Sequence, residues 1–419
     1  MARRSAPCRG MCCEAASGMD RRGEIASLTG LRGLAALLVV IGHFSVWTIV
    51  APRAEMPTWI AQWGGATPGI GMSIFFTLSG YVIALSYAHW NWRERPGFNL
   101  VRFFFYRFAR LYPAFFVFAI LILVRSPPLR DLSNPEAQAY LAPHLLLWQS
   151  WLPVKYGGAL VADDLFHVSW SLSAECGLYL LFGIGAIVVA ALPPWQWKSR
   201  VVALVFIATG FALLQTAWVM RGDLAPGGWS SGDWYLWLFA FSPWGVSIQF
   251  GIGVAAYLLS SSALFQRFAR MASDLGAAGL VAIYALCALA IVWEQTTQAI
   301  VVSLATAALM VGSRSSSWVN RFLTQPVILY VGTISYSLYL FHFLAPSLGF
   351  SGGMATFNEA SAAYSLVNFV LSLALAIVIA TGVYRLVEVP GRRAIRSAAD
   401  KLLGIRRPSM LGEHGAPAE

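Results

Sequence analysis

The sequence contains ten apolar stretches, most of about 17 to 25 residues, which is the length an α-helix needs to cross a bilayer. Only 11% of its residues are charged and 58% are hydrophobic, whereas about 25% are charged in a typical soluble domain. The sequence therefore predicts an all-α fold, a polytopic membrane helix bundle with about ten transmembrane helices. The stretches lie near residues 34–50, 70–87, 103–124, 169–191, 201–219, 236–259, 276–293, 298–312, 327–345 and 365–387.

The basic residues predict how these helices are oriented, because cytoplasmic loops are enriched in lysine and arginine. With the N-terminus placed inside, 21 of the 29 basic residues fall in inner segments and five in outer segments. The other three, Arg107, Arg110 and Arg385, lie at the inner ends of spans. We expect a multi-pass protein of the cell (inner) membrane with both termini cytoplasmic. The net charge of +10 then reflects orientation in the membrane, and no nucleic-acid partner is expected.

Three parts follow from the span positions. Residues 1–27 are expected to form a cytoplasmic N-terminal tail, 28–390 a membrane domain and 391–419 a cytoplasmic C-terminal tail. The longest hydrophilic segment is an outer loop from about residue 125 to 167, which contains the turn signals "SPP" and "NPE". No hydrophilic segment is large enough to fold as a separate soluble domain.

The first span contains two ionisable side chains, Arg32 and His43. A charge at the middle of a bilayer costs at least a few kcal/mol, so such groups usually face the bundle interior and mark a functional path. Arg32 is expected at the inner end of the span, where it can also simply reach the lipid headgroups. His43 lies eleven residues further on, roughly 16 Å along a helix, where the alternative role is that of a hydrogen-bonded packing residue.

Polar residues recur in other spans. Ser79 lies deep in the second span beside Gly80, and Arg107 and Arg110 share one face of the third at its inner boundary. Individually these residues have structural explanations as interface anchors, orientation charges or close helix contacts. Together they indicate a polar track through the bundle. The remaining members lie at the outer start of the fourth span and along the ninth, namely Trp170, Glu175, Tyr339 and His342.

Several motifs on this track resemble those of the acyltransferase-3 family, integral-membrane enzymes that O-acylate cell-surface sugars and some secondary metabolites. The most specific is the arginine, ten residues, histidine pattern in "GLRGLAALLVVIGH". It is followed in the family's order by "FFTLSGY", "YRFARLYP", "WSLSAE", "SYSLYLFH" and "VEVP". The resemblance runs from about Leu28 to Pro390. Thr29 departs from it, since many members have an aspartate there, which affects only the surroundings of Arg32.

The resemblance implies transfer of an acyl group, by default acetyl, from cytoplasmic acyl-CoA to a carbohydrate hydroxyl. Such a reaction needs a base and donors for the developing oxyanion. His43 is the expected base, with a covalent acyl-histidine carrier as the alternative, and Arg32 and Glu175 are the other expected catalytic residues. Guanidinium groups suit the phosphates of CoA, so Arg107 and Arg110 are expected to bind the donor. Contacts to substrate are expected from Ser79, Trp170, Tyr339 and His342.

The expected partners are membrane lipids and a carbohydrate acceptor. If the chain does not complete the transfer alone, a separate extracytoplasmic transferase that receives the acyl group is a further expected partner. No metal is expected. A secondary transporter or flippase is the main alternative, because its polar residues near the midplane look similar, although paired broken segments in the two halves are not evident. A scaffold protein with a vestigial polar track is the third interpretation.

Overall fold

The computed structural model describes residues 25–46, 58–155 except 88 and 132, 166–191, 230–260, 266–288, 295–345 except 314 and 316, and 362–405. Six helices in these residues are long and apolar enough to cross a membrane, and two shorter ones are also apolar. The predicted all-α membrane bundle is therefore confirmed. The six are Ala26–Ser45, Trp63–Tyr87, Pro96–Arg125, His167–Ala191, Ala269–Leu286 and Leu366–Leu402.

Helices occupy the position of every predicted span except the fifth, 201–219, which lies outside the described residues. Residues 1–24 and 406–419 of the two predicted tails also lie outside them. Two π-helical turns, Trp237–Phe241 and Tyr384–Glu388, lead into α9 and α17. The helices are α2 (Ala26–Ser45), α3 (Thr58–Tyr87), α4 (Pro96–Arg125), α5 (Pro135–Leu145), α6 (Trp170–Ala191), α8 (Ser231–Leu236), α9 (Pro243–Ser260), α11 (Ala269–Ala288), α12 (Gln295–Val311), α13 (Trp318–Leu323), α14 (Pro326–Phe341), α16 (Ala362–Val383) and α17 (Val389–Leu402).

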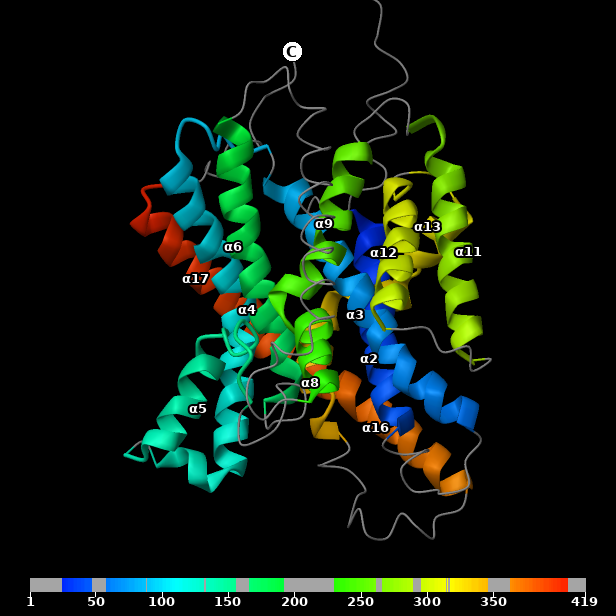
Figure 1. Ribbon diagram of the computed structural model, residues 1–419, viewed down its shortest axis with the longest axis horizontal. Coiled ribbons are helices and arrows are strands. Elements are labelled where there is room, and N and C mark those ends of the chain that lie inside the picture. Colours follow the sequence, from blue (N-terminus) through cyan, green and yellow to red (C-terminus); the bar gives the residue numbers. More distant parts are fainter. Residues whose placement is uncertain are drawn as a thin grey trace, which may run out of the picture.

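Helices α2 and α3 form the centre of the bundle (Figure 1). Helix α2 packs against α3 and α14, and α3 also packs against α9 and α12. Helix α4 contacts α6, α14 and the C-terminal helix α17, while α5 lies at the edge of the molecule in Figure 1. Because α2 has partners from both ends of the chain, its polar residues are enclosed by helices rather than by lipid.

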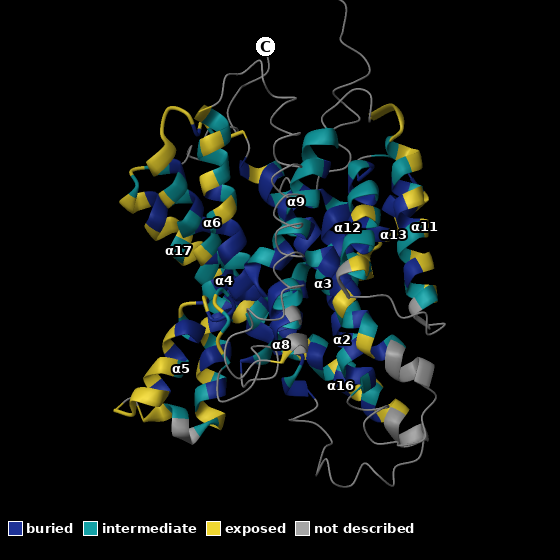
Figure 2. Ribbon diagram, in the orientation of Figure 1, coloured by how far each residue is buried: buried dark blue, intermediate teal, exposed yellow. Residues whose placement is uncertain are grey.

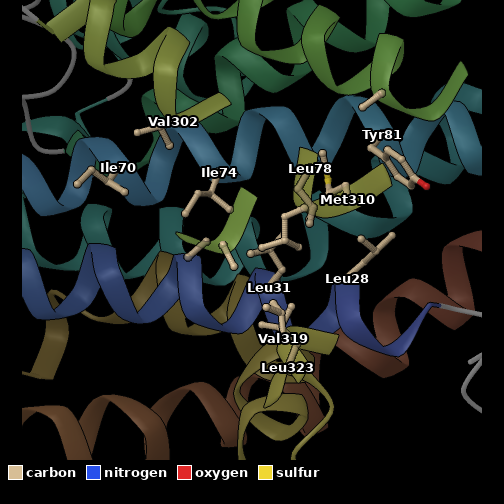
Figure 3. Packing of buried hydrophobic residues seen from close by; sticks show 14 of the residues in the cluster. Leu28, Leu31, Ile70, Ile74, Leu78, Tyr81, Val302, Met310, Val319 and Leu323 are labelled. Carbon is tan, nitrogen blue, oxygen red and sulfur yellow. The ribbon is translucent and has the colours of Figure 1, made fainter. Parts of the chain in front are cut away.

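Apolar side chains fill the contact between α2 and α3 and also cover the outside of the bundle. Leu31 of α2 and Ile74 and Leu78 of α3 belong to one buried cluster (Figure 3). On the outer helices, Val281 and Val378 are each 66% exposed, and Figure 2 shows such exposed positions around the buried centre. Lipid tails are as apolar as these side chains, so their exposure is favourable only in a membrane.

Two glycines bring the backbones of α3 and α9 into contact. A Cβ atom on Gly253 would lie 1.9 Å from the carbonyl oxygen of Thr77, and one on Gly80 would lie 2.1 Å from the carbonyl oxygen of Phe250. Neither carbonyl can move without shifting its helix. The structural explanation of Gly80 as a close helix contact is thus confirmed, and small residues at such crossings are typical of membrane bundles.

We expect Gly253→Ala to destabilise the bundle, because the added methyl group overlaps the backbone of α3. Overpacking of this kind costs about 1–3 kcal/mol, and it should appear as a lower thermal unfolding temperature in detergent. Gly251→Ala is the matched control, since a Cβ at Gly251 on the same helix meets nothing within 4 Å. Equal melting temperatures for the two variants would contradict the close contact.

Candidate active site

Helix α2 places Arg32 and His43 on one face. Eleven residues make slightly more than three full turns, so the two side chains point in nearly the same direction roughly 16 Å apart along the axis. Both are partly buried. The helix begins at Ala26, eight residues before the predicted span, so Arg32 lies in the second turn of a packed helix and not at its end.

Arg32 opens onto a cavity of about 90 Å³ in the centre of the bundle, which is room for several water molecules. Helices α2, α3, α4, α6 and α14 all contribute side chains to its wall. Six of the predicted site residues line it, namely Arg32, Ser79, Arg107, Arg110, Glu175 and Tyr339. The structure therefore joins three cations and one carboxylate that are far apart in the sequence.

Glu175 accepts hydrogen bonds from two side chains, one on α3 and one on its own helix α6. The hydroxyl of Ser79 donates to its Oε1 over 3.0 Å, and the hydroxyl of Tyr179, one turn further along α6, donates to the same oxygen. Glu175 is also an electrostatic neighbour of Arg107. The carboxylate is thus fixed in place next to a guanidinium group.

Arg107 lies between two tyrosine rings. Its Nη2 donates to the hydroxyl of Tyr87 over 3.2 Å, and its guanidinium carbon lies 5.2 Å from the ring centroid of Tyr87 and 5.4 Å from that of Tyr179. Such cation–π contacts stabilise a desolvated guanidinium group. Its buried Nε has no hydrogen-bond partner among the described residues, so Arg107 keeps a donor that a bound anion can use.

Helix α4 extends beyond the third predicted span at its N-terminal end. It begins at Pro96, seven residues before the predicted span, so Arg107 and Arg110 lie about 16 and 21 Å into the helix. Both arginines share one cavity with Glu175, expected at the outer start of the fourth span, and with Tyr339, an expected substrate contact. Donor-binding and acceptor-binding candidates therefore meet in one place.

The two histidines form a pair beside this cavity and are not among the described residues that line it. Nδ1 of His43 lies 3.1 Å from Nε2 of His342, and the two rings are stacked with their centroids 5.1 Å apart. Nδ1 of His342 lies 2.6 Å from the carbonyl oxygen of Tyr339. Tyr339 links the two sites, because its side chain lines the cavity while its carbonyl contacts the histidine pair.

The hydroxyl of Tyr339 connects α14 to the start of α6, where Trp170 packs on α3 and on the turn before α9. The hydroxyl of Tyr339 donates to the carbonyl of Val168 over 3.0 Å and lies 2.7 Å from the hydroxyl of Ser171. Trp170 packs on Phe76, with ring centroids 6.0 Å apart, and on Phe241 at 4.9 Å. Phe76 lines the cavity and Trp170 does not, so Trp170 lies one side chain behind the cavity wall.

Glu388 is a charged residue that the predicted site omits. It is 3% exposed, ends the π-helical turn before α17 and accepts a 2.8 Å hydrogen bond from Ser337. Arg32 and Arg110 are among its electrostatic neighbours. A carboxylate at the end of an apolar run is itself a signal for a functional residue. Glu388 belongs to the "VEVP" motif but was not among the predicted site residues.

Cations dominate the site, and this suits an anionic ligand. Three arginines and one carboxylate line the cavity, and Glu388 is an electrostatic neighbour of two of these arginines. Guanidinium groups bind phosphate and carboxylate through paired hydrogen bonds. In the part of the chain that the structure describes, histidine, cysteine, aspartate and glutamate form no group of three that could hold a metal ion. The absence of a metal stays a prediction.

Comparison with known proteins gives the family of the sequence. The model of the family described as "Acyltransferase domain" matches residues 25–385. The acyltransferase MdmB of Streptomyces mycarofaciens is 28% identical over 396 residues, 92% of this chain and 94% of that protein. The peptidoglycan O-acetyltransferase OatA of Listeria monocytogenes is 26% identical over 202 residues, 47% of this chain and 29% of that protein. No solved structure matches significantly.

Proposed function

Because this chain belongs to the acyltransferase-3 family of multi-pass membrane acyltransferases, we propose that it transfers an acyl group from cytoplasmic acyl-CoA. The proposed acceptor is a hydroxyl of a cell-surface or lipid-linked carbohydrate. Acetyl is the proposed acyl group and acetyl-CoA the proposed donor. The name of the relative OatA, a peptidoglycan O-acetyltransferase, supports both an acetyl donor and a carbohydrate acceptor.

The main support for this proposal is a cavity lined by three arginines, which lies next to a histidine pair in the same helix bundle. Arg107 and Arg110 bind the phosphates of the donor, because a guanidinium fork matches phosphate oxygens. Glu175 holds Arg107 in position through its charge. Arg32, on the wall of the same cavity, shares the binding of the donor with them.

The thioester then has to reach His43. The face of α2 between Arg32 and His43 spans roughly 16 Å, a distance that an extended pantetheine arm covers. Ala36 and Val39 on that face are fully buried, so the proposal requires neighbouring side chains such as Phe75 or Tyr339 to move when the donor binds.

His43 is the proposed general base. It takes the proton of the acceptor hydroxyl while that oxygen attacks the thioester carbonyl, and the tetrahedral intermediate collapses with cleavage of the carbon–sulfur bond. The same imidazolium returns its proton to the departing CoA thiolate. The acceptor approaches from the outer side, past Ser79, Tyr339 and Trp170, which contact the sugar in this proposal. A separate extracytoplasmic protein is the proposed recipient if the final transfer occurs outside the membrane.

The proposed reaction is tested with purified protein in detergent or vesicles. Acetyl-CoA is supplied with candidate sugar acceptors, and release of the CoA thiol is measured together with the mass of the acceptor. We expect both a thiol and an acceptor 42 mass units heavier, the approximate gain of one acetyl group. Mass analysis of surface glycans from cells with and without the gene identifies the acceptor. Cells whose glycans and other glycosylated products are identical in the two strains would contradict the proposal.

The proposed orientation has both termini in the cytoplasm, since 21 basic residues fall in segments assigned to the inside and five in outer segments. Reporter fusions after Arg200 and after Arg396 are expected to be cytoplasmic. A fusion within residues 131–154, for example in the exposed turn at Ser133, is expected to be external. A C-terminal reporter on the external side would overturn the ten-span topology.

A further inference from the structure

We propose that His342 is a positioning residue that fixes the tautomer of His43, so that the nitrogen acting as base is Nε2. This inference rests on the proposed function, in which His43 is the general base. It changes the expected role of His342 from contacting the acceptor to acting through another side chain. The tautomer is decided by which atoms of the pair can donate a hydrogen bond and which can accept one.

The carbonyl groups at the end of helix α14 determine which nitrogen of His342 carries the proton. The last four carbonyl groups of a helix have no partner within it, and α14 ends at Phe341, which leaves the Tyr339 carbonyl in this group. Nδ1 of His342 lies 2.6 Å from that oxygen. A carbonyl oxygen can only accept, so Nδ1 of His342 carries the proton and, in the neutral ring, Nε2 does not.

The protonation of His342 in turn determines which nitrogen of His43 carries a proton. Nε2 of His342, with its lone pair, lies 3.1 Å from Nδ1 of His43, and a hydrogen bond between them requires a proton on Nδ1 of His43. In the neutral ring the lone pair of His43 is then on Nε2. A chain of two hydrogen bonds that starts at a backbone carbonyl thus decides which nitrogen of His43 can take a proton.

Burial keeps this arrangement in place. His342 is 0% exposed, and its ring packs on Phe44 with the centroids 6.1 Å apart in addition to its stacking on His43. His167, three residues before the start of α6, is an electrostatic neighbour of both imidazoles. The pair therefore has little freedom to rotate, and Nε2 of His43 is on the ring edge away from Nδ1 and His342.

The arrangement also supports the charge that forms during the reaction. When Nε2 of His43 takes the acceptor proton, the ring becomes an imidazolium whose Nδ1 proton is already directed at the lone pair of His342. That hydrogen bond becomes charge-assisted and so strengthens. In Ser-His-Asp enzymes a carboxylate orients the base in the same way. In this proposal the neutral imidazole of His342, hydrogen-bonded to a backbone carbonyl, has that role.

The test replaces His342 with residues that keep or remove its two hydrogen bonds. His342→Gln retains a donor for the Tyr339 carbonyl and an acceptor for His43, whereas His342→Leu retains neither. We expect His342→Leu to lower kcat about 100-fold, the lower end of a general base's contribution, with the KM for acetyl-CoA unchanged. We expect His342→Gln to recover most of that loss. His342→Met is the second apolar variant, for use if leucine prevents folding.

His144→Leu is the matched structural control. His144 is also fully buried and its Nδ1 also lies 2.6 Å from a backbone carbonyl, that of Tyr140, but it belongs to α5 and does not line the cavity. We expect this variant to lower thermal stability while leaving kcat unchanged. A similar fall in kcat for His144→Leu would show that the His342 result reflects stability alone and would overturn the proposal.

A double variant separates this inference from the proposed function. If His342 acts only through His43, the His43→Gln and His342→Leu double variant is no slower than His43→Gln alone, because residues that act as a unit are non-additive. Losses that multiply would overturn the inference. Full activity of folded His342→Leu, with His43→Gln inactive, would also overturn it while leaving the proposed function intact. Full activity of His43→Gln would overturn the proposed catalytic role itself.

Discussion

His43→Gln and His43→Ala are both expected to lower the transfer rate about 100-fold to 10,000-fold, the usual contribution of a general base. The glutamine variant is the more informative of the two. Its amide keeps much of the volume and can still donate a hydrogen bond to Nε2 of His342, which lies 3.1 Å from Nδ1 of His43, but it cannot take up a proton. Acetyl-CoA should still bind, because its phosphates are assigned to arginines in the neighbouring cavity.

A packing role for His43 predicts a different outcome. Glutamine would then restore most activity, and alanine would act through a lower melting temperature or lower expression. Single-turnover rates and donor affinity, measured on the same purified samples, distinguish the two explanations. A stable His43→Gln protein with near-normal transfer would remove His43 from the mechanism and leave the family membership unchanged.

Arg107→Ala and Arg110→Ala are expected to weaken acyl-CoA binding. Loss of one partner from a buried, hydrogen-bonded charge pair costs about 2–5 kcal/mol, which corresponds to roughly a 30-fold or larger increase in Kd. Lysine should rescue poorly at either position, because an ammonium group is a point charge without the planar fork of arginine. The measurement is donor affinity in detergent, for example by calorimetry with a non-hydrolysable acyl-CoA analogue.

Arg102→Ala is the control for charge on the same helix. Arg102 stacks on Trp90, 4.4 Å from the ring centroid, and donates to the hydroxyl of Tyr106, but it does not line the cavity. We expect the affinity of the Arg102→Ala variant for acyl-CoA to stay close to the wild-type value. Because Arg107 also neighbours Glu175, melting temperatures are compared in parallel. Wild-type donor affinity in a double alanine variant would exclude Arg107 and Arg110 from the donor site.

The fold class could be predicted from the sequence because each long helix is apolar enough to be recognised alone. The residues at which the helices begin could not be predicted in the same way. Helices α2 and α4 begin at Ala26 and Pro96, seven or eight residues before the predicted spans, because Arg32 and Arg102 lower the local hydropathy where the helix continues. Hydropathy measures transfer into lipid, whereas these turns are stabilised by neighbouring helices.

The site was predictable as a set of residues but not as a geometry. Arg32, Arg107 and Glu175 were each identified as costly polar groups in apolar spans, and they do line one cavity. Which groups meet depends on helix contacts, and a single sequence contains no signal for the contact of α2 with α14. Hence the pairing of His342 with His43 was missed, and so was the packing of Trp170 on Phe76, behind the cavity wall.

The partnership of α2 with α14 has a consequence for how the protein is made. His43 and His342 are 299 residues apart in the chain, and the ribosome needs roughly 15 to 60 s to add that many residues. During this interval the polar face of α2 is already synthesised while its partner does not yet exist. Biogenesis must therefore shelter Arg32 and His43 from lipid, and a prematurely terminated product, however well inserted, lacks the helix that completes the histidine pair.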